Sequence, residues 1–291
     1  MHYHEPVFRP PSEADSLLLP VTDGCSRNRC TFCAMYAGKA FRALPPDDVF
    51  ADIDEAAAMP WRPRRAFLLD GDALSAPQDF LEAVLARIRD RLPWIGRVGV
   101  YGDSSAIVRK GPDGMRRLAA LGLGIVYHGL ESGNEDVLRR VRKPETTARM
   151  VRAGRILRDA GVRYSVMALL GLGGVELSEV HARDTAAVLS AADPDYIGLL
   201  TVMPVPGTPF HDDVAAGRVV LPDPLGMVRE LRAILAGLDV TAARFSANHA
   251  SNYLPLTGDL PADRDRLLAQ VDRILAAGDA GLLKPEWRRG L

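Results

Sequence analysis

Six short apolar runs alternate with helical patterns along the chain. The runs have the length of buried strands, and they cover residues 16–21, 66–69, 95–101, 124–130, 162–170 and 195–202. Apolar positions spaced as on one face of a helix follow at residues 46–59, 78–91, 112–121, 146–160, 178–190 and 224–238. Strands that alternate with helices predict right-handed crossovers and a parallel sheet. We therefore expect an α/β fold, a partial (β/α)6 TIM-like barrel over residues 1–240, followed by a C-terminal helical extension over residues 241–291 with a helix near 261–278.

Composition is that of an ordinary globular protein, because 47% of the 291 residues are hydrophobic and 25% are charged. The 36 basic and 37 acidic residues give a net charge of −1, which argues against attachment to nucleic acid or to an anionic membrane through bulk charge. No apolar run approaches the roughly 18 residues that a membrane-spanning helix needs. The first residues also lack the basic and apolar regions of a secretion signal. We expect no membrane partner.

The three cysteines lie within nine residues, as Cys25, Cys30 and Cys33, with the spacing C-x4-C-x2-C. Three thiolates on one short loop repel one another, and a metal centre relieves that repulsion. A structural zinc site takes four protein ligands, and here His2 or His4 would have to supply the fourth. A [4Fe–4S] cluster held by three cysteines leaves one iron open to another ligand. The spacing therefore favours an open-iron cluster with the three cysteines as metal ligands.

Polar side chains and glycines follow the predicted strands at their C-terminal ends, where the chemistry of α/β barrels is located. Tyr101 and His128 lie on or just beyond such ends and are catalytic candidates, with a buried core residue as the alternative. After the barrel, residues 244–256 are dense in hydrogen-bonding side chains. We expect this segment to cap the substrate site, with His249 and Tyr253 as further catalytic candidates. The alternative is a docking loop whose polar groups satisfy the backbone.

These motifs together resemble the radical S-adenosylmethionine (SAM) superfamily, in the branch similar to oxygen-independent coproporphyrinogen oxidases and radical methylthiotransferases. The resemblance runs from about Leu17 to Phe210. Its carriers are the cysteine loop and residues 67–73, 129–134, 171–174 and 206–209. The chain departs from the family in two places. The usual spacing is C-x3-C-x2-C, so one extra residue stands between Cys25 and Cys30, and Asp70-Gly71-Asp72 replaces a Gly-Gly-Glu segment.

The resemblance implies that the cysteines hold three irons of a [4Fe–4S] cluster and leave the fourth for SAM. Asp72 would accept hydrogen bonds from the SAM amino group, and Glu131 and Ser132 would face the ribose. The complete set of implied SAM-binding positions is Phe32, Tyr36, Asp70, Gly71, Asp72, Glu131, Ser132, Gly171, Gly173 and Met203.

The implied reaction is reductive cleavage of SAM to a 5′-deoxyadenosyl radical, which abstracts hydrogen from a small-molecule substrate. With no further cysteine, a second cluster is disfavoured. Oxidation, decarboxylation, rearrangement and group transfer remain as reaction types. Electrons would come from a reducing partner such as flavodoxin or ferredoxin. Because oxygen destroys an exposed reduced cluster, a cytoplasmic location is expected.

Three other functions stay open. Arginines at residues 139–158 raise the alternative of a tRNA-modifying enzyme, although their spacing beside an apolar stripe is typical of an outer barrel helix and disfavours a nucleic-acid partner. A haem-handling member of the branch would bind its ligands without turnover. A zinc-stabilised binding protein would contain no cluster.

Overall fold

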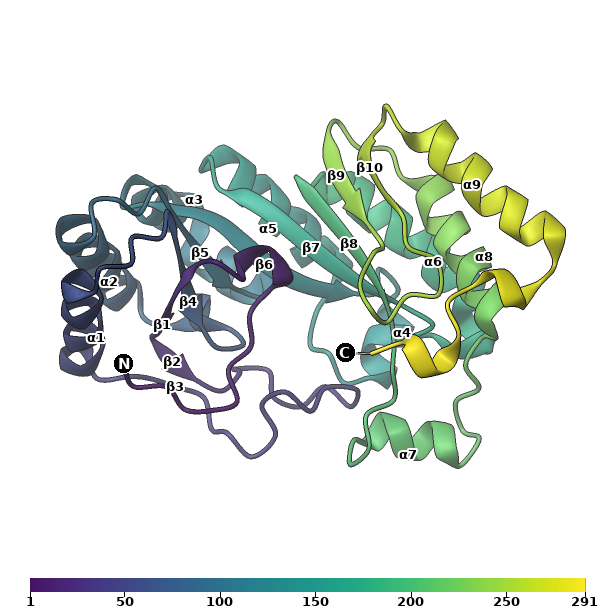
Figure 1. The fold of residues 1–291 in the computed structure, drawn as a ribbon, viewed down its shortest axis with the longest axis horizontal. Helices are drawn as coiled ribbons and strands as arrows, with labels where there is room; N and C mark the ends of the chain where they lie inside the picture. Colours follow the sequence, from purple (N-terminus) through teal and green to yellow (C-terminus); the bar gives the residue numbers. More distant parts are fainter. Residues whose placement is uncertain (291) are drawn as a thin grey trace. The chain divides into compact units, whose positions relative to one another are not determined.

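The computed structural model describes residues 1–290, which form an α/β fold (Figure 1). Eight strands make one mostly parallel sheet that is not closed, in the order β1-β4-β5-β6-β7-β8-β9-β10. The strands are β1 (Leu17–Pro20), β4 (Arg65–Leu69), β5 (Arg97–Tyr101), β6 (Leu123–Glu131), β7 (Arg163–Leu170), β8 (Tyr196–Thr201), β9 (Ala243–Ser246) and β10 (Thr257–Leu260). A separate ribbon pairs β2 (Thr22–Asp23) with β3 (Arg42–Ala43). The predicted fold class, an α/β partial barrel, is confirmed.

The seven predicted helices occur in the predicted order, and most of their ends agree with the sequence pattern to within a few residues; two short helices, at residues 135–140 and 209–215, were not predicted. They are α1 (Pro46–Ala58), α2 (Gln78–Arg91), α3 (Ser104–Ala120), α4 (Glu135–Arg140), α5 (Thr147–Asp159), α6 (Gly174–Ala192), α7 (Pro209–Ala215), α8 (Pro224–Gly237) and α9 (Arg264–Ala277). Helix α3 begins eight residues before the predicted position at 112. Gly111 has φ 67° and Pro112 follows it, so the helix is kinked there and the apolar pattern reveals only its second half.

The C-terminal segment contains two strands besides the predicted helix. Strand β9 runs parallel to β8, and β10 pairs antiparallel with β9. Each has only four residues, and the polar side chains of Arg244 and Asp259 pair across them at 3.1 Å. No apolar run marks these strands, which is why the sequence predicts a purely helical extension at this point.

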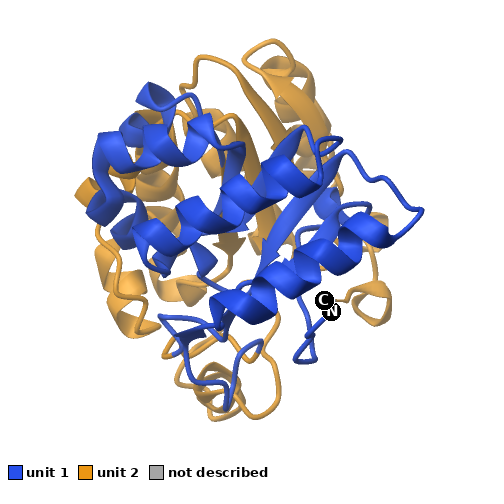
Figure 2. Cartoon of the chain, turned by 90° about the vertical axis from the view of Figure 1, so that its left-hand side faces the viewer, with its two compact units in different colours: residues 1–28, 35–128, 155–164 blue, residues 29–34, 129–154, 165–291 orange. Residues whose placement is uncertain are grey.

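Two compact units make up the chain (Figure 2). Unit 1 comprises residues 1–28, 35–128 and 155–164, and unit 2 comprises residues 29–34, 129–154 and 165–291. Residues 241–291, the expected extension, belong entirely to unit 2. The boundary expected at residue 240 stays a prediction.

Within unit 1, one face of the sheet carries a cluster of aromatic rings. Phe67 on β4 meets Tyr101 on β5 edge to face, with 5.1 Å between ring centres, and Tyr101 lies 6.1 Å from Tyr127 on β6. The hydroxyl of Tyr127 donates to the fully buried Glu13 over 2.5 Å. Arg97 pairs with the same carboxylate. These contacts fill the unit 1 face with aromatic and hydrogen-bonded side chains.

Within unit 2, β7 and β8 have one buried face and one partly exposed face. Val166 and Leu199 are fully buried, whereas Met167, Leu169 and Leu200 are partly exposed. Leu169 pairs with Leu200 in the ladder, so these side chains share one face. Helices α6 and α8 pack against each other. Among residues 1–290, no helix combines the length and the apolar character needed to cross a membrane.

Candidate functional site

The loop that carries the first cysteine is attached to the turn after β4. Gly24 has φ 71°, and a Cβ at this position would lie 2.9 Å from the carbonyl oxygen of Lys39. The Gly24 amide donates to Oδ2 of Asp70 over 2.6 Å, and its carbonyl accepts from the Gly71 amide over 3.1 Å. Asp70 has φ 82°, which is costly for a residue with a side chain. Its hydrogen bond to Gly24 offsets that cost, so the aspartate holds the cysteine loop.

Gly71 is required by close packing rather than by its backbone angles. A Cβ there would lie 2.5 Å from Cε2 of Tyr36 and 2.8 Å from the Cβ of Cys25. Tyr36 is buried, and Cys25 is partly exposed. The structure therefore brings together three residues that the sequence assigns to the cofactor site, namely Cys25, Tyr36 and Gly71.

Asp72 is buried and accepts hydrogen bonds from three protein groups. Its carboxylate accepts from the hydroxyls of Ser26 and Ser75 and from the amide of Asp103 over 3.1 Å. Burial, followed by the charge of Asp103, raises the pKa of Asp72 to about 6. Asp103 in turn pairs with Arg27. Asp72 thus fastens the residue after Cys25, and its role toward SAM stays a prediction.

Tyr101 and His128 lie in different surroundings, although the sequence offers both as catalytic candidates. Tyr101 lies in the aromatic cluster of unit 1, and burial raises its pKa. His128 is 1% exposed, follows Tyr127 on β6 and therefore points to the opposite face of the sheet. Its Nδ1 lies 2.6 Å from the hydroxyl of Tyr164, and the two rings are stacked. The contacts of His128 are those expected of a core residue.

The second and third cysteines lie in unit 2 on a short turn. The amide of Cys33 donates to the carbonyl of Cys30 over 3.3 Å. Between them, Thr31 donates its amide to Val141 over 2.9 Å and accepts the amide of Phe210 over 3.0 Å. The backbone of the turn is therefore anchored at the ends of α4 and α7. Phe32 packs against the apolar cluster formed by Val137, Val141, Leu172, Val202, Phe210 and Val219.

Lys143 is a charged neighbour of Cys30 that the sequence pattern did not single out. Burial raises the pKa of the Cys30 thiol, and Lys143 opposes that shift. The Lys143 ammonium lies 3.4 Å from Oε1 of Glu131, and both side chains keep 12–14% exposure. In the sequence, Lys143 is hidden in the arginine-rich stretch assigned to the outside of the barrel. Its position next to Glu131, which has φ 64°, makes it part of the candidate site.

The turn after β6 is fastened to α6. Ser132 is fully buried, and its hydroxyl lies 2.8 Å from Nδ1 of His181. Gly133 donates its amide to the Thr185 hydroxyl over 2.9 Å, and Asn134 donates to Asp184 over 2.7 Å. The Ser132 hydroxyl thus helps to hold the turn, and its implied role at the ribose stays a prediction.

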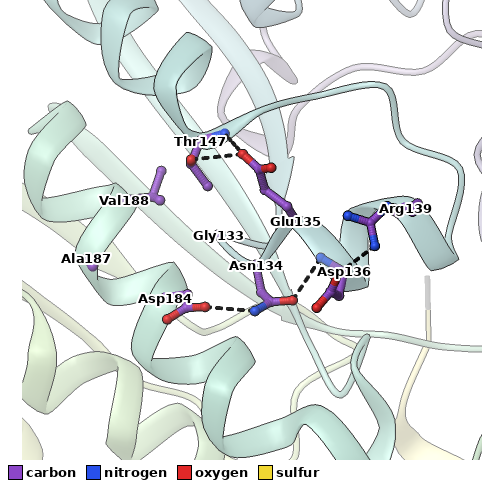
Figure 3. A pocket seen from close by; sticks show the side chains of 9 residues that line it. All are labelled: Gly133, Asn134, Glu135, Asp136, Arg139, Thr147, Asp184, Ala187 and Val188. Atoms are coloured by element: carbon purple, nitrogen blue, oxygen red, sulfur yellow. Dashed lines mark hydrogen bonds and ion pairs between the residues drawn. The ribbon is translucent and has the colours of Figure 1, made fainter.

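An open depression of about 510 Å³ lies beside this turn (Figure 3). Its polar side chains already pair with one another, since Arg139 contacts Asp136 and Thr147 donates to Glu135 over 3.1 Å. The remaining residues that line it are Gly133, Asn134, Asp184, Ala187 and Val188. Among them, Gly133 and Asn134 tie the turn to α6, and no residue of the lining was predicted to bind a cofactor.

The turn after β7 depends on glycine. Gly171 has φ 80°, and a Cβ there would lie 2.4 Å from the methyl carbon of Met227. The Gly171 amide donates to Oε1 of the buried Glu230 over 2.5 Å. Gly173 precedes α6, and Met203 lies partly exposed just after β8. Gly171, Gly173 and Met203, three of the implied SAM-binding positions, thus lie at or near strand ends.

The loop after β9 is fixed by its own polar groups. Asn252 is 1% exposed and donates to the carbonyls of Leu199 and Ala247 over 2.7 Å each. His249 Nδ1 accepts the Ser251 amide over 3.2 Å, and burial lowers the His249 pKa.

Tyr253, in the same loop, is held from the C-terminal segment. Its hydroxyl donates to Glu286 over 2.6 Å, and the Arg289 guanidinium lies 3.9 Å from the ring centre. Burial and Glu286 raise its pKa to about 12. The catalytic roles of His249 and Tyr253 stay predictions.

The cysteines have the donor chemistry of an iron–sulfur site. All three are partly exposed and none is joined in a disulfide, and the Arg27 amide donates to the sulfur of Cys25 over 3.4 Å. Amide hydrogen bonds to sulfur and nearby charge are the features by which proteins tune such clusters. In the part of the chain that the structure describes, no three ligating side chains are gathered as a formed metal site.

A family model described as the radical SAM superfamily matches residues 19–185 of the 291 residues. The chain belongs to this superfamily. Membership confirms the predicted enzyme class and its cofactors, a [4Fe–4S] cluster and SAM. The particular reaction and substrate are not given by the family, which includes methyltransferases and oxidases.

Solved structures support the fold. The radical SAM methyltransferase TsrM from Kitasatospora setae has 20% identity and a TM-score of 0.59 over 70% of this chain. The coproporphyrinogen III oxidase HemN from Escherichia coli has 15% identity and a TM-score of 0.56 over 76% of this chain and 52% of its own. This radical SAM chain spans only 39% of the TsrM chain. A comparison with curated proteins finds no match.

Proposed function

We propose that this radical SAM protein is a single-cluster enzyme that acts on a small molecule. The observation that carries the proposal is the cysteine loop, whose first ligand is tied to the Asp70–Asp72 turn and whose other two lie on an anchored turn. Cys25, Cys30 and Cys33 would bind three irons and leave the fourth for SAM. When bound, the reduced cluster and SAM would supply a 5′-deoxyadenosyl radical that abstracts hydrogen from the substrate.

Charged side chains near Cys30 suit the polar part of SAM. Glu131 and Lys143 are opposite in sign, partly exposed and 3.4 Å apart. Lys143 would attract the SAM carboxylate, and Glu131 would accept hydrogen bonds from the ribose hydroxyls. Ser132 supports this by holding the turn that carries Glu131. Gly71, Gly171 and their neighbours would allow close approach of the cofactor.

The partly exposed face of β7 and β8 supports a small, weakly charged substrate. Met167, Leu169 and Leu200 are apolar, and Gly198 leaves space beside Met167 in the ladder. Such a face lacks the basic side chains that bind RNA phosphates. A small-molecule substrate therefore fits better than tRNA. Oxidation, decarboxylation, rearrangement and group transfer all stay compatible with a single cluster.

The proposed chemistry needs a one-electron donor, for which flavodoxin or ferredoxin is suited. An oxygen-sensitive cluster of this kind would be stable in a reducing cytoplasm. The proposed electron donor and the proposed location both depend on the presence of the cluster.

Anaerobic reconstitution with iron and sulfide, followed by dithionite and SAM, tests the proposal. We expect a brown protein that forms 5′-deoxyadenosine. Cys30→Ala should lose both the colour and the product, and Met35→Ala, an exposed position in the same loop, should keep them. A colourless protein with bound zinc would contradict the cluster, and a brown protein without product would support the non-catalytic, haem-handling alternative.

A further inference from the structure

A fully buried histidine lies between two turns to which the proposed function assigns SAM. His181 is on α6 and 0% exposed. Its Nδ1 lies 2.8 Å from the hydroxyl oxygen of Ser132, in the turn after β6. Its Nε2 lies 3.1 Å from the carbonyl oxygen of Leu169 and 3.4 Å from Oε1 of Glu230, beside the turn after β7. The imidazole ring of His181 therefore contacts a residue of the first turn, Ser132, and two residues next to the second turn, Leu169 and Glu230.

The hydrogen-bond partners determine where the proton of His181 resides. The Leu169 carbonyl can only accept, so Nε2 carries the hydrogen and donates. With Nε2 protonated in a neutral ring, Nδ1 is an acceptor, and Ser132 donates its hydroxyl hydrogen to it. Burial lowers the pKa of His181, which favours this neutral form. The ring thus accepts from the first turn and donates at the second.

The first turn, after β6, packs closely against α6. The Ser132 oxygen also accepts the Asn134 amide over 3.0 Å. A Cβ on Gly133 would lie 2.3 Å from the backbone oxygen of Asp184, so the turn is in direct contact with the α6 backbone. Figure 3 shows Asn134 and Asp184 pairing next to this contact. Movement of Ser132 would therefore move the whole turn that carries Glu131.

On the side of the second turn, Glu230 on α8 is the support. Its Oε1 accepts the Gly171 amide over 2.5 Å, and its other oxygen accepts the Ser178 hydroxyl. Glu230 is 2% exposed, so its carboxylate depends on these donors and on the neighbouring imidazole. The buried polar groups form one chain from Ser132 through His181 to Glu230 and Gly171.

We propose that His181 is a positioning residue that, together with Glu230, fixes the Glu131–Asn134 turn and the Gly171–Gly174 turn in the arrangement that binds SAM. The proposal rests on the proposed function, because it assumes that both turns contact SAM. His181 itself is too buried to touch the cofactor and acts through Ser132 and Glu230. Truncation should therefore weaken SAM binding without removing the cluster ligands.

Two substitutions of His181 distinguish its hydrogen bond to Ser132 from its hydrogen bond to Leu169. His181→Asn places an amide oxygen near the Nδ1 position and keeps an acceptor for Ser132. His181→Gln places an amide nitrogen near the Nε2 position and keeps a donor for Leu169. Leu189→Val is the matched control, because Leu189 is a fully buried residue of the same helix outside the polar chain.

The measurement is the Kd for SAM of the reconstituted protein, together with iron content, Tm and the KM and kcat for 5′-deoxyadenosine formation. We expect both His181 variants to keep wild-type iron content and to bind SAM on the order of tenfold more weakly, with the change in KM rather than kcat. Ser132→Ala should weaken binding further in His181→Asn and add little to His181→Gln, where the contact is already lost.

A purely structural role gives a different result. SAM affinity equal to wild type, or equal to that of Leu189→Val at matched Tm, would overturn the positioning role while leaving the proposed function intact. A wild-type protein that assembles a cluster but binds no SAM would overturn both.

Discussion

Asp72→Asn is predicted to remove a pH-dependent destabilisation. Asp72 is 1% exposed, and burial together with Asp103 raises its pKa from 3.8 to about 6. Between these values the folded protein binds more protons than the unfolded chain, so the free energy of unfolding falls as the pH rises. A pKa difference of about two units between the folded and unfolded states lowers the free energy of unfolding by about 3 kcal/mol, and the whole loss is present above the folded-state pKa. Asparagine has no charge to bury.

The assay is urea unfolding of the thiol-reduced, cluster-free protein at a series of pH values from 4 to 8. The variant should gain about 3 kcal/mol relative to wild type over this range. Asp79→Asn, which removes an exposed carboxylate from α2, is the control for loss of one negative charge. A difference between variant and wild type that stays constant with pH would rule out a raised Asp72 pKa. It would mean that the hydroxyls of Ser26 and Ser75 stabilise the charged form as well as water does.

Three further predictions concern packing, charge and hydrogen bonding. Gly71→Ala should cost about 1–3 kcal/mol and lower iron incorporation, because its Cβ would lie 2.5 Å from a buried ring; Gly96→Ala, with 3.7 Å to its nearest atom, should show neither effect in urea unfolding and iron assays. Lys143→Gln should raise the Cys30 pKa, seen as slower alkylation of the cluster-free thiol at pH 8. Asn252→Ala should cost about 1–3 kcal/mol by calorimetry, since it strands two buried carbonyls. An unchanged stability or iron content, an unchanged alkylation rate, or an unchanged calorimetric stability would contradict the corresponding prediction.

The fold was predictable where packing leaves a local pattern. All six apolar runs became strands, because strands buried in a parallel sheet are apolar along their whole length. Strands β9 and β10 were missed because they are short and polar, and their pairing partners are set by tertiary contacts. The first half of α3 was missed because the Gly111–Pro112 kink interrupts its period.

The residue types of the candidate site could be read from the sequence, but the hydrogen bonds that these residues make could not. Gly71 and Gly171, both implied SAM-binding positions, have close neighbours that leave no room for a Cβ. Ser132 and Asp72 also make hydrogen bonds to protein groups, which no spacing in the sequence reveals, and their expected roles at SAM stay predictions. Lys143 was missed because its neighbours in sequence are surface arginines, and only the fold places it near Cys30.

The proposed enzyme depends above all on a [4Fe–4S] cluster with one iron that binds SAM. Electron paramagnetic resonance of the dithionite-reduced, reconstituted protein tests this, recorded with and without SAM and accompanied by an iron analysis. We predict about four irons per chain and a spectrum that changes when SAM is added, with both lost in Cys30→Ala. A full cluster whose spectrum is unchanged by saturating SAM, or a cluster that persists in Cys30→Ala, would contradict this assignment.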